Sequence, residues 1–249
     1  MLIYGINPVA EALRAGRVTR LRVADRSDAR LKAILSDAGR HHIEVAHVDA
    51  ATLDRLSRNG VHQGVVADID APRVDTLDGL VASASGPVLL VVLDGVEDPH
   101  NVGAIIRTVD AAGAHGVVRQ TRHAASLDGA AAKASAGAVS HVPVVDVVNI
   151  ARAVTELKDL GVWTIGLAGD SAQSYETVDW TQPSAVVLGA EGSGLRRLVR
   201  EKCDMVVSIP MAGHVESLNV SVASGVVLFE AGRQRRNLQE RPGPPVKKR

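Results

Sequence analysis

The feature that most constrains the fold is a regular alternation of apolar segments of strand length with amphipathic segments of helix length. It begins at Val88–Leu93, an uninterrupted apolar run that is typical of a strand buried on both faces. Such alternation predicts an α/β fold with a mostly parallel sheet covered by helices. The predicted strands are Val88–Leu93, Gly116–Arg119, Val142–Val145, Trp163–Leu167, Ala185–Leu188 and Val206–Ile209, and the predicted helices are Val102–Ala112, Asp128–Ala134, Ile150–Lys158, Leu195–Cys203 and Val220–Gln234.

The chain divides into a small and a large domain. Residues 1–70 show short strand and helix patterns of their own and predict a small α/β domain. Residues 71–86 are rich in Pro, Ser and Gly, which predicts a linker with one short helical stretch. Residues 87–235 hold the alternating pattern, and the basic, proline-containing segment 236–249 predicts a disordered tail.

Composition restricts the function. The formal net charge is zero, which by itself argues against a nucleic-acid partner, although the first 60 residues and the C-terminal end are basic. Solvated helix faces and a disordered tail explain these basic residues when they are taken alone. The two Trp, two Tyr and one Phe disfavour stacking of single-stranded bases on aromatic side chains. Any contact with RNA is therefore expected to use shape, phosphates and 2′-hydroxyls.

Several other classes are excluded. Cys203 is the only cysteine, so neither an intramolecular disulfide nor a cysteine-based metal cluster is possible. No apolar run approaches the roughly 20 residues that a membrane crossing needs, and Met1–Gly5 does not resemble a signal peptide. The first strand of the large domain is followed by neither G-x-G-x-x-G nor a P-loop, so no dinucleotide or nucleoside triphosphate is indicated. We expect a cytoplasmic protein with no membrane partner.

Three predicted strands lead into loops rich in Gly, Asn, Ser and Glu. These loops lie within Asp94–Arg107, Gly189–Leu195 and Met211–Ser221. Because parallel strands end at one edge of the sheet, where α/β proteins bind ligands, the loops are expected to form one site. In the first loop Asn101 is placed as a helix N-cap, with Arg107 almost two turns further on. Taken alone, this loop fits a capped connection as well as a functional site.

Together the three loops resemble the motifs of the SpoU (TrmH) family of RNA ribose 2′-O-methyltransferases, within the knotted SPOUT superfamily. The resemblance implies a deep trefoil knot in the large domain, an L30e-like N-terminal domain that binds the RNA substrate, S-adenosylmethionine as cofactor, and a homodimer. It implies RNA rather than DNA as partner. Lys133–Ala138 and Val142–Val144 are similar to the subgroup that modifies large-subunit ribosomal RNA. The implied activity is methyl transfer to the ribose 2′-hydroxyl of a guanosine in 23S rRNA.

Two alternatives to this activity stay open. The first is ribose 2′-O-methylation of tRNA, because relatives that modify tRNA share the core motifs. The second is a non-catalytic RNA-binding factor for ribosome assembly on the same fold. Methyl transfer itself requires no metal, only alignment of the hydroxyl with the methyl group and help with loss of the proton.

The resemblance also assigns residues. Implied cofactor-binding residues are Gly189, Ile209, Met211 and Leu218, and implied catalytic residues are Asn101, Arg107, Glu191, Ser217 and Asn219. From sequence alone Ile209 and Leu218 fit an ordinary core better than a ligand site, and their cofactor role comes from the resemblance. A guanidinium stays protonated at ordinary pH, so Arg107 is expected to hold an RNA phosphate and stabilise developing alkoxide charge rather than act as a base. Glu191 is expected to pair with Arg107.

Overall fold

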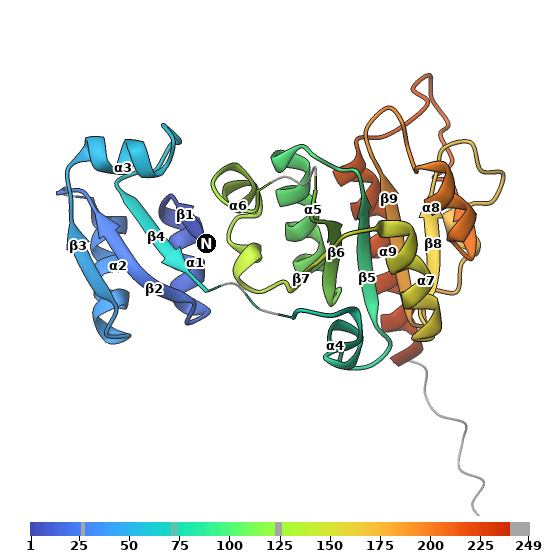
Figure 1. Cartoon of the computed structure of the whole chain (residues 1–249), viewed down its shortest axis with the longest axis horizontal. Helices are drawn as coiled ribbons and strands as arrows, with labels where there is room; N and C mark the ends of the chain where they lie inside the picture. Colours follow the sequence, from blue (N-terminus) through green and yellow to red (C-terminus); the bar gives the residue numbers. More distant parts are fainter. Residues whose placement is uncertain (26–27, 71, 73, 123–125, 240–249) are drawn as a thin grey trace, which may run out of the picture.

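Two separate β-sheets organise the chain, as Figure 1 shows. The computed structural model describes residues 1–25, 28–70, 72, 74–122 and 126–239. One sheet has four strands in the order β1-β4-β2-β3, and the other has six in the order β10-β8-β9-β5-β6-β7. Within the described residues, none of the helices combines the length and the apolar character that a membrane crossing requires.

The four-stranded sheet is built by the first seventy residues. Its β4 pairs antiparallel with β1 and β2, whereas β2 and β3 are parallel. Helices α1 and α2 pack on one face through residues such as Val9 and Leu31, and α3 packs on the other through Leu53. The elements are β1 Leu2–Tyr4, α1 Ile6–Arg14, β2 Val18–Val23, α2 Ala29–Arg40, β3 Glu44–His47, α3 Ala50–Leu56 and β4 Val65–Ile69.

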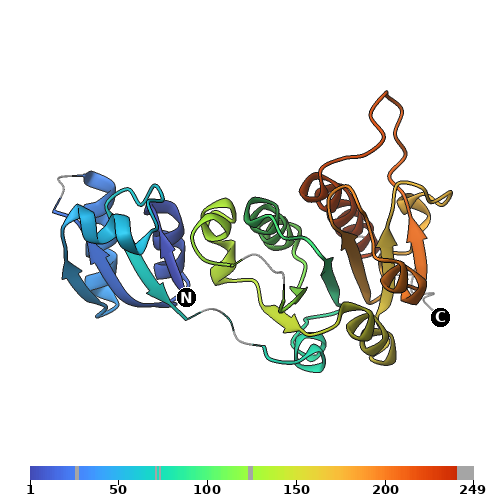
Figure 2. The same cartoon turned by 45° about the horizontal axis from the view of Figure 1, so that its top comes forward.

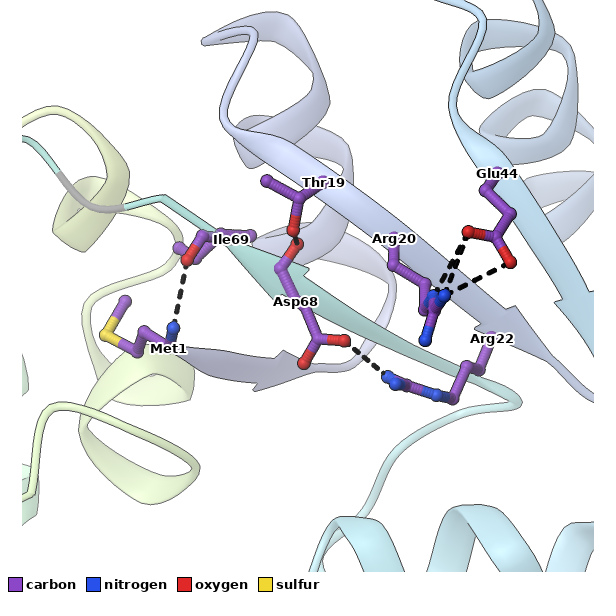
Figure 3. A network of polar contacts seen from close by, with 7 residues as sticks. All are labelled: Met1, Thr19, Arg20, Arg22, Glu44, Asp68 and Ile69. Atoms are coloured by element: carbon purple, nitrogen blue, oxygen red, sulfur yellow. Dashed lines mark hydrogen bonds and ion pairs between the residues drawn. The ribbon is translucent and has the colours of Figure 1, made fainter.

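An exposed part of this sheet carries charges in cross-strand pairs, which Figure 3 shows. Arg20 on β2 binds Glu44 on β3 at 3.0 Å, and Arg22 binds Asp68 on β4 at 2.8 Å. The Arg20–Glu44 pair is exposed, and surface ion pairs of this kind contribute only about 0–1 kcal/mol. The pairing neutralises part of the N-terminal arginine cluster.

The six-stranded sheet confirms the predicted parallel α/β architecture, because every pair of neighbouring strands in it is parallel. The short helix α4, Leu77–Ala82, precedes it. Its strands are β5 Leu89–Asp94, β6 Gly116–Gln120, β7 Val144–Val147, β8 Trp163–Leu167, β9 Ser184–Gly189 and β10 Met205–Val207. Its helices are α5 Pro99–Ala112, α6 Ala130–Ala134, α7 Ile150–Asp159, α8 Arg197–Lys202 and α9 Val220–Gln239.

Helices cover both faces of the larger sheet. All six residues of β5 are buried, and alternate side chains enter different cores. Leu89, Val91 and Leu93 belong to the core that includes α5 and α9, whereas Leu90 and Val92 pack with α4, α7 and α8. Each fully buried Val or Leu contributes about 1.5–3 kcal/mol of transfer free energy. The continuous apolar sequence of β5 therefore fixes it in the middle of the domain.

The two sheets belong to parts of the chain that pack on each other. Helix α1 contacts α6 and the 3₁₀ turn Ala138–Ser140, and strand β1 contacts α6. Figures 1 and 2 both show α1 and α6 side by side. Glu11 on α1 lies 3.1 Å from the ring of His141. One apolar cluster includes residues of both sheet units, so the four-stranded unit is attached by packing as well as by the connecting chain.

The end of α9 corrects the expected start of the tail. The helix continues to Gln239, so the tail expected from residue 236 does not begin there, and residues 240–249 lie outside the described residues. Near its end, Arg235 donates hydrogen bonds to the backbone oxygens of Val88, Trp180 and Gln182 at 2.8–3.0 Å. Burial lowers the pKa of this guanidinium below its usual value. These long-range bonds, which sequence patterns do not report, hold the helix end against the sheet.

Candidate active site

A cavity of about 270 Å³ opens at the carboxyl ends of β8 and β9. Five segments line it: the ends of these two strands, the turn after β9, the long segment between β10 and α9, and the first turn of α9. Figure 2 shows that last segment projecting far from the sheet. Six of the expected site residues line the cavity: Gly189, Glu191, Ile209, Met211, Ser217 and Leu218. The cavity thus lies at the edge of the sheet that the sequence predicted.

The turn after β9 folds back on the end of its own strand. The backbone of Ala190 exchanges two hydrogen bonds with that of Gly194, at 2.9 and 3.1 Å. A Cβ at Gly189 would lie only 2.1 Å from the carbonyl carbon of Gly194 and 2.3 Å from the nitrogen of Leu195. Gly189 is therefore required by the close approach of the turn's own backbone. The sequence indicated a close approach here, but toward a ligand.

The three loops meet at Glu191. Its Oε1 atom accepts hydrogen bonds from the side-chain amides of Asn101, at 2.7 Å, and Asn219, at 2.8 Å. The same amide of Asn219 also donates to Oδ1 of Asn101, at 3.0 Å. Asn101 is buried and lies 90 residues from Glu191 in the sequence. One predicted residue from each loop thus contributes to a single polar cluster beside the cavity.

The role expected for Asn101 at the start of α5 is wrong. The N-cap is Asp98, whose Oδ1 accepts from the backbone N–H of His100 at 3.0 Å, and Pro99 is the first helical residue. Proline is favoured at that position because its φ is already helical and it has no N–H to satisfy. Asn101 therefore falls inside the first turn, where its side chain is free to reach Glu191 and Asp98.

The expected pairing of Glu191 with Arg107 is also wrong. Arg107 is exposed on α5 and forms no ion pair within the described part of the chain. At about 100° per residue, a position six residues after Asn101 lies about 240° around the helix. Because Asn101 already faces Glu191, Arg107 faces elsewhere. Its guanidinium is exposed to solvent instead of being fixed by Glu191.

Sequence reasoning missed one wall of the cavity. Leu167, Ala168 and Gly169, which follow β8, line it together with Glu216. A usable signal existed, because β8 was predicted and a parallel strand must end at the same edge as its neighbours. The lining includes two acids, Glu191 and Glu216, and no basic side chain among the described residues. The cavity wall therefore favours a ligand with positive charge.

Comparison with known proteins then decides the family. The SpoU rRNA methylase family matches residues 88–229, which is more than half of the chain. A second family, described as RNA 2′-O ribose methyltransferase substrate binding, matches residues 2–74. The chain belongs to the SpoU family.

Individual proteins match this SpoU-family chain over almost its whole length. It is 48% identical over 238 residues to the 23S rRNA (guanosine-2′-O-)-methyltransferase RlmB of Burkholderia sp, covering 94% of this chain and 96% of that protein. It is 45% identical to an uncharacterized tRNA/rRNA methyltransferase of Mycolicibacterium vanbaalenii, over 95% of this chain and 77% of that one. Among solved structures, AviRb of Streptomyces viridochromogenes in complex with AdoMet matches with a TM-score of 0.79 and 29% identity, over 95% of this chain and 91% of that chain.

The close approach of Gly194 to Gly189 predicts the effect of adding a side chain at Gly189. We expect Gly189→Ala to weaken binding of S-adenosylmethionine, the ligand in the AviRb complex, by at least about tenfold, a loss of about 1.4 kcal/mol. The added methyl group must displace the backbone of Gly194 and with it the cavity wall. Isothermal titration calorimetry measures the affinity. Gly213→Ala is the matched control, because a Cβ there meets nothing within 4 Å. Equal affinities for the two variants would contradict the argument.

Proposed function

We propose that this SpoU-family protein is an enzyme that transfers a methyl group from S-adenosylmethionine to the ribose 2′-hydroxyl of a guanosine in 23S rRNA. The observation that carries the proposal is the cluster of Asn101, Glu191 and Asn219 beside the cavity. It joins residues of all three family motifs, which a protein that only bound RNA would have no need to hold together at a ligand cavity. The names of the relatives, RlmB above all, support the reaction and the substrate.

The residues that line the cavity fit the cofactor. Ile209, Met211 and Leu218 offer an apolar wall for the adenine ring, and the turn at Gly189 offers backbone groups for hydrogen bonds. The carboxylates of Glu191 and Glu216 suit a ligand that carries a sulfonium and an ammonium group. When bound, S-adenosylmethionine supplies a methyl group activated by the positive sulfur. We infer that these residues hold it.

The protein's part in the reaction is to align and activate the sugar hydroxyl. Asn101, Glu191 and Asn219 fix the three loops relative to one another, and Ser217 presents a hydroxyl to the cavity. Arg107, which is exposed, binds an RNA phosphate and stabilises the negative charge that develops on the 2′-oxygen. The proton leaves to the phosphate or to water, because a guanidinium does not accept it.

The small domain is proposed to bind the RNA substrate. We propose that residues 1–70 are an L30e-like unit with this role, which is supported by the description of the family that matches residues 2–74 as RNA 2′-O ribose methyltransferase substrate binding. Its packing on α6 keeps it at a fixed position relative to the cavity.

We further propose that residues 87–235 form the catalytic domain and that this domain contains the trefoil knot of the SPOUT superfamily. We also propose that the enzyme works in the cytoplasm, where ribosomal RNA lies.

The experiment that tests the function is transfer of tritiated methyl groups. We expect incorporation into unmodified 23S rRNA, with the label mapped to a guanosine 2′-oxygen. Incorporation into tRNA alone would favour the second candidate, a tRNA methyltransferase, which the tRNA/rRNA name of the Mycolicibacterium relative supports. Absence of transfer to any RNA, despite measurable cofactor binding, would favour a non-catalytic assembly factor and reject the proposal.

The role of Arg107 predicts a specific kinetic defect. Arg107→Lys keeps the charge but loses the forked guanidinium, so the turnover number should fall about 10²-fold, the scale for one preorganised charge-stabilising contact. Cofactor affinity should not change, because Arg107 does not line the cavity. Arg152→Lys, at an exposed position of α7, is the control. A variant with wild-type turnover would show that Arg107 is only a surface residue.

The exposed face of α9 supports a homodimer. Val222 and Phe229, two turns apart on this helix, are 53% and 51% exposed. A second copy of the chain is proposed to cover them. Analytical ultracentrifugation at micromolar concentration should give a dimer for the wild-type protein and a monomer for Phe229→Glu. Leu198→Glu, at a residue 50% exposed on α8, should leave the dimer intact. A wild-type monomer at this concentration would contradict the proposal.

A further inference from the structure

A fully buried carboxylate lies just outside the cavity. Asp94, the last residue of β5, has no solvent exposure. Its Oδ2 accepts from the backbone N–H of Arg196 at 2.8 Å, and its Oδ1 accepts from Nε of the same residue at 2.6 Å. The Nη2 atom of Arg196 also lies 2.5 Å from Oδ1. A single residue thus supplies two hydrogen-bond donors and an ion-pair contact to this buried acid.

We propose that Asp94 and Arg196 form a positioning pair that holds the turn 189–195 in place and thereby sets the affinity of the cofactor site. The inference rests on the proposed function, since it concerns the same cavity. Neither residue lines that cavity, so both act through the turn.

The position of the pair explains why the turn depends on it. Strand pairing places Asp94 opposite Gly189, so the beginning of the turn is fixed by the sheet. Arg196 follows the end of the turn, and its backbone N–H is bound by the same Asp94. The carboxylate therefore fixes the end of the turn close to its beginning. Between these two points lie Glu191 and the glycines that line the cavity.

The guanidinium of Arg196 also binds a residue on a second strand, β6. Its Nη2 donates to Oε1 of Gln120, the last residue of β6, at 2.8 Å. The side chain of Arg196 is 52% exposed, whereas that of Asp94 is not exposed at all. A buried carboxylate needs a compensating charge and hydrogen bonds, or its burial is strongly unfavourable. Arg196 supplies both, and it links the turn to the ends of two strands.

A role confined to the stability of α8 predicts something different. Arg196 is the N-cap residue of α8, and a pair that only held this helix would lower the melting temperature and leave ligand affinity of the folded protein unchanged. A pair that positions the turn changes affinity in a protein that is still folded. Cofactor affinity, measured below the melting temperature of every variant, distinguishes the two roles.

The test uses the full-length protein and S-adenosylmethionine as the probe. Asp94→Asn keeps the shape of the side chain and removes its charge, and we expect the dissociation constant to rise at least about tenfold, which corresponds to about 1.4 kcal/mol. The Michaelis constant for the cofactor should rise in parallel, while the turnover number at saturating cofactor stays within about threefold of wild type. Arg196→Lys keeps a positive charge but loses the fork, and should weaken binding in the same direction.

Arg197→Lys is the matched control, because Arg197 is the next residue and pairs with Glu201 at the surface, away from the turn. We expect no change in affinity for it. In a double-mutant cycle, Asp94→Asn and Arg196→Lys should be non-additive in cofactor affinity, whereas Asp94→Asn and Arg197→Lys should be additive.

The outcomes separate the two proposals. If the wild-type protein binds no S-adenosylmethionine, the proposed function fails. If the wild type binds it and both Asp94→Asn and Arg196→Lys bind within twofold of that affinity, the positioning pair is rejected and the contact is structural. If Asp94→Asn does not fold, Arg196→Lys alone decides, because it leaves the buried carboxylate with a positive partner.

Discussion

The parallel pairing of β5 with β9 is the constraint on which the candidate site depends. The register runs from Leu89 opposite Ser184 to Asp94 opposite Gly189. Residues far apart in the sequence therefore leave the sheet at the same edge, and the first two loops begin side by side. Each further contact of the site follows from this: Asp94 reaches the residue after the turn, and Asn101 reaches Glu191 within it.

Two carboxylates at the carboxyl edge of the sheet, those of Asp94 and Glu191, have different roles because one is buried and the other is exposed. Asp94 is fully buried and needs a cation, which Arg196 supplies. Glu191 is exposed, accepts from two neutral amides and forms no ion pair with any residue that the structure describes, so its charge stays at the cavity wall. Asp94 therefore holds the turn after β9 through an ion pair, whereas Glu191 joins the three loops through neutral amides and keeps its negative charge at the cavity wall. Such an arrangement suits the proposed cationic cofactor better than a nucleotide, whose phosphates would be repelled.

The packing of the four-stranded unit, residues 1–70, determines the direction from which the proposed RNA substrate would approach α5. Its β1 and α1 pack on α6, and α6 in turn packs on α5, the helix that carries Asn101 and Arg107. Gly103 permits this contact, since a Cβ there would lie 2.4 Å from the backbone oxygen of Ala131. RNA held by the small domain would be presented from a fixed direction to the exposed face of α5. Packed helices therefore connect the four-stranded unit to α5, in addition to the connecting segment.

Sequence patterns by themselves determined the architecture and the edge at which the site lies. The apolar run of β5 and the strand–helix alternation after it are patterns among neighbouring residues. A strand that is buried on both faces consists of consecutive apolar residues, so it can be recognised in the sequence directly. The motif residues likewise identified six lining residues of the cavity without any coordinates.

Only the tertiary structure decided which groups touch. Asn101 was expected to cap a helix, but Pro99 places the cap at Asp98, and Asn101 binds a carboxylate 90 residues away. The Asp94–Arg196 pair spans 102 residues, and the last turns of α9 are held by backbone oxygens at the start of β5. Periodicity and propensity describe neighbours along the chain. Hydrogen-bond partners at a loop edge depend on strand register and helix rotation, which are set by the packing of the whole domain.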